Sequence, residues 1–99
     1  MSFPKPSKYR SKVRIYFDIL EVIWREGGKA RPTKILYGAN LSYDRLQKYI
    51  SQLKEKGFIV EFKDESDGIV WYELTDKAYN FLEEFRKIQK FMDAFGFSI

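Results

Sequence analysis

The chain has 99 residues, no cysteine and no histidine, and 44% of it is hydrophobic, with nine Phe, seven Tyr and two Trp. These numbers favour one small domain with an aromatic core, and they exclude disulfides, thiol chemistry and the usual zinc ligands. Without His, Cys or a Gly-rich phosphate loop, we expect no enzyme, no cofactor and no metal. No run approaches the ~20 apolar residues of a membrane span. The N-terminus lacks the apolar stretch of a secretory signal, so a cytoplasmic location is expected.

The formal net charge of +4 is unevenly distributed along the chain. Residues 1–57 carry 13 Lys/Arg and five Asp/Glu, whereas residues 58–99 carry five and nine. This asymmetry favours a polarised surface with one face suited to a polyanion. Ordinary variation of surface charge is the alternative.

The N-terminal half predicts an arm followed by helices. Residues 1–8 hold two prolines and no periodicity, which is typical of a flexible basic arm. A first helix is expected from about Tyr9 to Glu26, ended by two glycines. Its apolar stripe consists of Val13, Phe17, Leu20 and Trp24.

The next segment predicts two helices joined by a tight turn. Residues 29–31 are expected to be extended, and Pro32 suits the first position of a short helix that stops at Gly38. Ser42 is a good N-cap for a longer helix over residues 43–56. A short helix, a turn and a longer helix form a helix-turn-helix unit.

The C-terminal part predicts a hairpin and a long helix. Residues 58–62 and 69–74 are rich in β-branched and aromatic residues, and the polar KDESDG between them favours a turn. Thr75 is expected to cap a last helix from Asp76 to about Ala94. The predicted fold is mainly α (α+β): a winged helix-turn-helix domain over residues 9–75 with a C-terminal dimerisation helix over residues 76–99.

The helix over residues 43–56 is the predicted recognition helix. Leu46, Ile50 and Leu53 recur at core spacing. In this unit the second helix enters the major groove of DNA, where Arg pairs with guanine and Gln with adenine. An ordinary solvent-exposed helix face is the alternative. The candidate DNA-binding residues are Ser42, Tyr43, Arg45, Gln47, Lys48, Ser51 and Gln52.

Further positive charges could hold phosphates beside the groove. The wing tip carries three acids and one Lys, so we expect it to stay clear of DNA, and we interpret it as a solvated turn rather than a cation site. The candidate phosphate contacts are Lys5, Lys8, Arg10, Lys12, Arg14, Lys29, Arg31, Thr33 and Lys34.

The last helix carries apolar residues spaced 3, 4, 3, 4 and 3 apart, as in the seam of a coiled coil. A small domain has little core left for so many large side chains, so we expect a homodimer. The alternative is a helix that folds back onto its own domain. The predicted dimerisation residues are Ala78, Phe81, Phe85, Ile88, Met92 and Phe95.

The segment TKILYGANLSY, residues 33–43, followed by Lys48-Tyr49, Leu53, Gly57 and Ile59, resembles an archaeal winged-helix family of small dimeric, partly chromatin-associated DNA-binding proteins. The resemblance covers roughly residues 16–60. It implies a winged fold, binding to double-stranded DNA and a dimer formed through an antiparallel C-terminal coiled coil. Similar short proteins are also encoded by archaeal viruses, so the sequence leaves host and viral origin open.

Two functions remain open from the residues. Arg45 and Gln47 favour a site-specific regulator, whereas the basic N-terminal half also fits sequence-tolerant architectural binding. A winged module that binds a protein partner instead of DNA is the alternative from another class.

Overall fold

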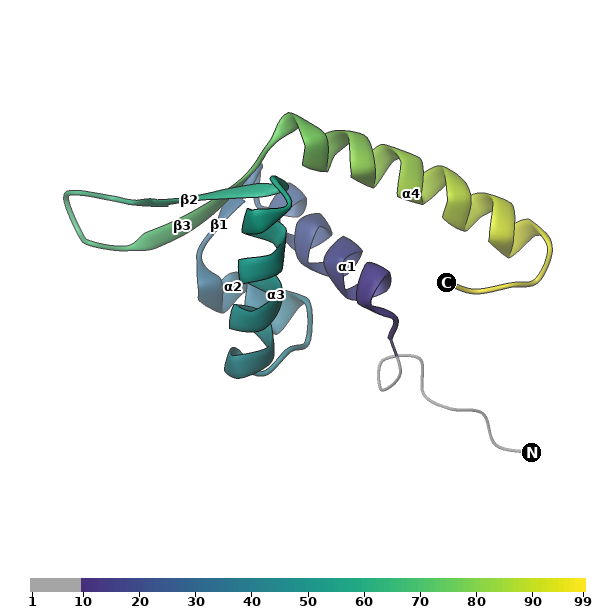
Figure 1. Ribbon diagram of the computed structural model, residues 1–99, viewed down its shortest axis with the longest axis horizontal. Helices are drawn as coiled ribbons and strands as arrows, with labels where there is room; N and C mark the ends of the chain where they lie inside the picture. The colour runs from purple at the N-terminus through teal and green to yellow at the C-terminus, as the bar shows by residue number, and fades with distance from the viewer. Residues whose placement is uncertain (1–9) are drawn as a thin grey trace.

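The computed structural model describes residues 10–99, and the predicted arm over residues 1–8 lies outside them. In Figure 1 the helices that precede the hairpin pack together on one side of a small sheet, the hairpin projects as a wing, and the long last helix extends the other way. The predicted winged-helix fold, mainly helical with a small sheet, is confirmed. The elements are α1 (Lys12–Arg25), β1 (Lys29–Ala30), α2 (Pro32–Gly38), α3 (Tyr43–Glu55), β2 (Ile59–Lys63), β3 (Val70–Leu74) and α4 (Asp76–Ala94).

Side-chain caps fix where three helices begin. The hydroxyls of Ser42 and Thr75 accept hydrogen bonds from backbone N–H groups three residues on, at 3.3 and 3.4 Å, which agrees with the predicted starts of α3 and α4. Ser11 caps α1 in the same way at 3.1 Å. Helix α1 therefore begins at Lys12 rather than at the predicted Tyr9, because a serine at the cap position satisfies a backbone donor that a helix start leaves unpaired.

The sheet has the order β1-β3-β2 and is antiparallel throughout. Successive side chains on a strand point to opposite faces. The inner face buries Ile59, Tyr72 and Leu74 against the helices, and the outer face carries Phe62 opposite Trp71. No helix in the described part of the chain is long and apolar enough to cross a membrane.

Helix α1 lies at the centre of the core. Phe17 and Leu20 are almost fully buried, as the apolar stripe predicts, but Val13 is 50% and Trp24 46% exposed. Both lie toward the ends of the helix, and the Trp24 ring is covered instead by the guanidinium of Arg86, 4.6 Å from its centroid.

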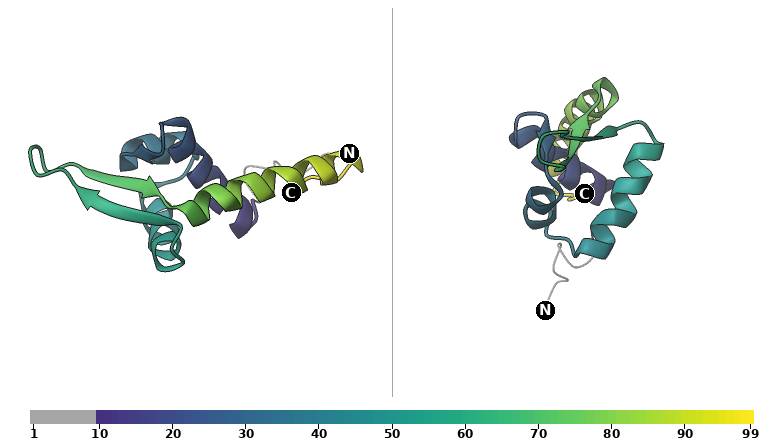
Figure 2. Two further views of the ribbon diagram at one scale, coloured as in Figure 1. Left: turned by 90° about the horizontal axis from the view of Figure 1, so that it is seen from above. Right: turned by 90° about the vertical axis from the view of Figure 1, so that its left-hand side faces the viewer.

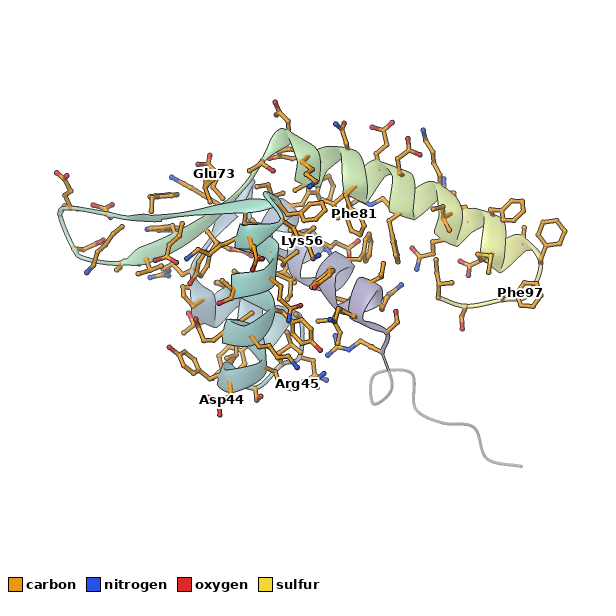
Figure 3. All side chains as sticks on the ribbon, in the orientation of Figure 1. Asp44, Arg45, Lys56, Glu73, Phe81 and Phe97 are labelled. Carbon is orange, nitrogen blue, oxygen red and sulfur yellow. The ribbon has the colours of Figure 1, made fainter. Side chains whose placement is uncertain are left out.

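Helix α4 is anchored to its own domain by its first half. Ala78, Leu82 and Phe85 are buried, and the Phe85 ring stacks on Phe17 with 4.3 Å between centroids. Phe81 packs against the Phe58 ring at 5.4 Å, and Figure 3 shows it on the side of α4 that faces the other helices. The first half of the predicted seam therefore contributes to the core of the single chain.

Candidate nucleic-acid interface

Helix α3 presents its N-terminal end to solvent. Its core side is fixed by Leu46, Ile50 and Leu53, which are 2% exposed or less. Figure 3 shows Asp44 and Arg45 at the free end of the helix. Of the predicted recognition residues, five are exposed: Ser42, Tyr43, Arg45, Lys48 and Ser51.

Two of these exposed residues share one aromatic ring. The Arg45 guanidinium lies 5.9 Å and the Lys48 ammonium 5.8 Å from the centroid of Tyr49. Tyr49 is itself buried and meets the Tyr16 ring edge-on at 5.9 Å. Cation–π attraction to a fixed ring restricts both side chains and keeps their charges together on one flank of α3.

The two glutamines of α3 face inward rather than outward. The Tyr16 hydroxyl donates a hydrogen bond to the Gln52 side-chain oxygen, which ties α3 to α1. Gln47 is half-buried beside Tyr72 of the wing. Burial raises the pKa of Tyr72, and the negative charge of Glu61 raises it further. Gln47 and Gln52 thus help to position α3 between α1 and the wing.

Arg10 is one of the predicted phosphate contacts, but its side chain instead bonds to other residues of its own domain. Its guanidinium donates to the Asp18 carboxylate at 2.8 Å and to the backbone oxygens of Ala39 and Asn40 at 2.7 and 3.0 Å. The side chain is only 10% exposed, and its Nε is buried without a partner among the described residues. Arg10 therefore fastens the turn between α2 and α3 to α1, and it cannot reach a phosphate while these contacts hold.

Replacing Arg10 by alanine is expected to lower the free energy of unfolding by about 2–3 kcal/mol, because two backbone oxygens and a carboxylate lose a charged donor. Arg10→Lys should recover only part of this loss, since an ammonium lacks the forked geometry that reaches several acceptors. Urea unfolding measures the effect. The neighbouring exposed Lys12→Ala is the control, within about 0.5 kcal/mol of the original. Equal unfolding midpoints for Arg10→Ala and Lys12→Ala would contradict this role.

The other predicted phosphate contacts that lie within residues 10–99 fall into three groups. Lys12, Thr33 and Lys34 are exposed near the starts of α1 and α2. Lys29 and Arg31 lie over rings of the wing instead. Arg14 is held by Asp18 at 3.2 Å. Lys5 and Lys8 lie outside the described residues.

Ion pairs within residues 10–99 leave Lys34 of α2 and Arg45 and Lys48 of α3 without a carboxylate partner, whereas Lys54 near the end of α3 pairs with Glu61. The pairs involve Arg10, Arg14, Arg25, Lys54, Arg86 and Lys87. In this part of the chain no carboxylate lies within the 4.0 Å of an ion pair from Lys12, Lys34, Arg45 or Lys48. Positive charge on this side of the domain is therefore available to an external anion.

The wing tip carries negative charge instead. Asp64 accepts hydrogen bonds from the Ser66 hydroxyl at 2.6 Å and backbone N–H at 2.8 Å, and these bonds lower the pKa of Asp64. The tip is thus a turn ordered by its own carboxylate. Across residues 10–99 no group of three or more acidic side chains is placed to hold a metal ion.

Two exposed residues near the recognition helix were not among the predicted contacts. Tyr37 of α2 is 81% exposed and lies close to the turn that leads to α3. Ile35 fills the buried side of α2, and a residue two positions further points to the opposite side of a helix, which is the signal that could have identified Tyr37. Asp44 is exposed beside Arg45, but an acid in a first helical turn is explained equally well by the helix dipole.

Known proteins are similar to this chain in sequence and in fold. The uncharacterized protein MJ0287 of Methanocaldococcus jannaschii is 37% identical over 82 residues, which cover 80% of this chain and 76% of that protein. The uncharacterized protein MJ0290 of the same organism is 34% identical over 83 residues, and this chain spans only 36% of its length.

Among solved structures, Sso10a-2, a DNA-binding protein from Sulfolobus solfataricus, superimposes with a TM-score of 0.70 at 31% identity, covering 86% of this chain and 87% of that one. A mutant of E. coli MarR complexed with operator DNA gives a TM-score of 0.62 at 20% identity, covering 70% of this chain and 49% of that one, and it supports the fold alone. The predicted resemblance to archaeal winged-helix proteins is confirmed at this level. Residues 9–93 match the winged helix-turn-helix family, and the chain belongs to it.

Proposed function

We propose that this protein binds double-stranded DNA as a homodimer, with the N-terminal half of α3 in the major groove. The observation that carries the proposal is the pair Arg45 and Lys48, held on the Tyr49 ring at the exposed end of α3 without a carboxylate partner in residues 10–99. Sso10a-2, which has the same fold at 31% identity, is described as a DNA-binding protein.

The exposed groups divide into base and phosphate contacts. Arg45 has the forked donors that match guanine in the major groove, and Asp44 beside it is an acceptor of the kind that pairs with cytosine. Lys48 and Ser51 follow on the next turns of α3. Lys12, Thr33 and Lys34 supply donors for the backbone on either side.

The exposed half of α4 supports the homodimer. Ile88, Phe91 and Phe95 are 53%, 62% and 65% exposed, an unusual amount of apolar surface for a chain of this size. An apolar groove of about 360 Å³ continues beside them between α1 and α4, lined by Ser11, Val13, Phe81, Glu84, Phe85, Ile88 and Ile99. The second copy's α4, with the same apolar repeat, is the occupant that would cover this surface symmetrically.

Measuring duplex binding across a salt series tests the proposal, and it also distinguishes an architectural protein from a sequence-specific regulator. We expect affinity for an arbitrary duplex to fall as salt rises, with a slope of about 0.9 per neutralised phosphate in the logarithmic plot. An architectural protein would bind all duplexes alike. A regulator would bind a selected sequence about 1,000-fold or more tightly than an arbitrary one. Absence of binding at low salt would reject the proposal.

A protein-interaction module is the second candidate, favoured by the acidic wing tip and the apolar half of α4. It predicts that α4 pairs with a different chain, so the purified protein would remain a monomer and would not bind a duplex.

A further inference from the structure

The outer face of the wing carries an aromatic surface that no helix within residues 10–99 covers. Figure 2, left, looks down on the hairpin and shows no helix crossing it, and Figure 3 shows Glu73 on this face, away from α3. Val60 is 49% exposed here, and Phe62 and Trp71 are half-buried. We define the wing platform as Lys29, Arg31, Val60, Phe62 and Trp71.

The platform is built in rows across the sheet. Phe62 of β2 pairs directly with Trp71 of β3, and Lys29 of β1 pairs with Glu73 on the other side of β3. The two ring planes differ by only 7°, with 6.5 Å between centroids. The two rings thus lie nearly parallel to one another across β2 and β3.

Both cations of the platform lie over these rings. The Lys29 ammonium is 5.3 Å from the Trp71 centroid and 5.7 Å from that of Phe62, and the Arg31 guanidinium is 5.7 Å from Trp71. Cation–π contacts at exposed sites contribute only about 0.5–1 kcal/mol each, so an anion can draw the cations aside. A ligand carrying both negative charge and flat rings would satisfy cations and aromatic faces together.

We propose that the wing platform binds single-stranded nucleic acid, with unpaired bases stacked on Trp71 and Phe62 and phosphates held by Lys29 and Arg31. Aromatic platforms flanked by positive charge bind single strands in this way because every base has a π-face. The bases of a duplex are already stacked and paired, so their faces are not available. The platform therefore adds a second specificity to the chain, and the proposal does not depend on duplex binding by α3.

The acids near the platform define where a strand can lie. Glu73 stands opposite Lys29 in the sheet register, and Asp64 at the tip lies close enough to Lys29 for the lysine's charge to contribute to its lowered pKa. Both repel phosphate. The backbone of a bound strand is accordingly expected on the Arg31 side of Trp71, away from the tip.

A purely structural explanation exists for the same rings. Cross-strand aromatic pairs stabilise antiparallel sheets by about 0.2–1 kcal/mol, and Phe62 and Trp71 are such a pair. This role requires apolar contact between the strands but no ligand. A variant that keeps the apolar contact and removes the ring separates the two roles.

Trp71 provides a direct probe, once Trp24→Phe has removed the other tryptophan. The full chain with Trp24→Phe is titrated with an oligothymidylate about ten nucleotides long, within the site sizes typical of single-strand binders. We expect quenching of Trp71 fluorescence. Adding Phe62→Leu should lower the affinity about 5- to 150-fold, the loss expected for one stacked base. Adding Phe62→Tyr, which keeps a ring, should preserve it.

Duplex binding by the same variants separates this proposal from the previous one. Phe62→Leu should leave duplex affinity within about twofold, whereas Arg45→Glu with Lys48→Glu should still allow Trp71 to be quenched at saturating oligothymidylate. Absence of Trp71 quenching, or equal oligothymidylate affinities for Phe62→Leu and Phe62→Tyr, would overturn the platform whatever the duplex result.

Discussion

The double variant Arg45→Glu with Lys48→Glu is expected to bind duplex DNA at least about 100-fold more weakly than the original protein, because a single good base contact already contributes about 1–3 kcal/mol. Both side chains are exposed, so the fold should be unaffected. In the variant, two cations at the groove become anions that face phosphates. The slope of affinity against salt should also fall by about 0.9 for each phosphate that the variant no longer neutralises. Fluorescence anisotropy of a labelled duplex measures both quantities.

A matched control separates position from net charge. Lys87→Glu with Lys90→Glu changes the charge by the same amount, but on exposed positions of α4. This control should lose only the small, long-range part of the affinity, since salt screens charges beyond about 10 Å. If the α4 control and the α3 variant lost affinity equally, the recognition-helix assignment would be wrong and only the overall positive field would matter.

The secondary structure could be predicted from the sequence because its signals are local. Pro32 and Gly38 mark both ends of α2, and Ser42 and Thr75 cap α3 and α4 through hydrogen bonds to backbone groups three residues on. Such signals require no knowledge of the tertiary fold. The family resemblance rests on the same region, and the structural match to Sso10a-2 bears out the winged fold that it implied.

The role of Arg10 could not be predicted from the sequence. It follows a run of positive charges that predicts a phosphate-binding arm, but its partners are a carboxylate eight residues away and two backbone oxygens about thirty residues away. Backbone acceptors carry no sequence signal. Gln52 is similar, since only the tertiary fold brings its oxygen to the Tyr16 hydroxyl. A polar pattern alone therefore predicts DNA contacts at some residues that instead hold the helices together.

The apolar repeat of α4 shows a second limit of prediction from the sequence. Its spacing identifies one face of the helix, but spacing does not say whether that face meets the same chain or another. Phe85 is 6% exposed because it stacks on Phe17, whereas Ile88 and Phe95 are more than half exposed. A charge at Phe85 would therefore unfold the domain, and a test of dimerisation belongs in the second half of the helix.

The variant Ile88→Glu with Phe95→Glu is expected to raise the dissociation constant of the proposed homodimer at least about 1,000-fold. Both substitutions occur twice in a symmetric dimer, and each removes apolar burial of about 1–3 kcal/mol while placing an unpaired charge at the interface. The monomer should stay folded, since Ala78, Leu82 and Phe85 still anchor α4. Sedimentation equilibrium at micromolar concentration gives the mass, and circular dichroism verifies the helices.

The same variant is also expected to bind duplex DNA more weakly. Two recognition helices on one duplex bind about 100- to 10,000-fold more tightly than one through effective concentration alone, so a folded monomer should lose affinity by a factor in that range. Lys87→Glu with Lys90→Glu places the same charges on the same helix away from the apolar repeat and should remain a dimer. If Ile88→Glu with Phe95→Glu also remains a dimer, the chains associate through another surface. If it is a monomer with undiminished duplex affinity, one winged domain is sufficient and the α4 surface serves a different partner.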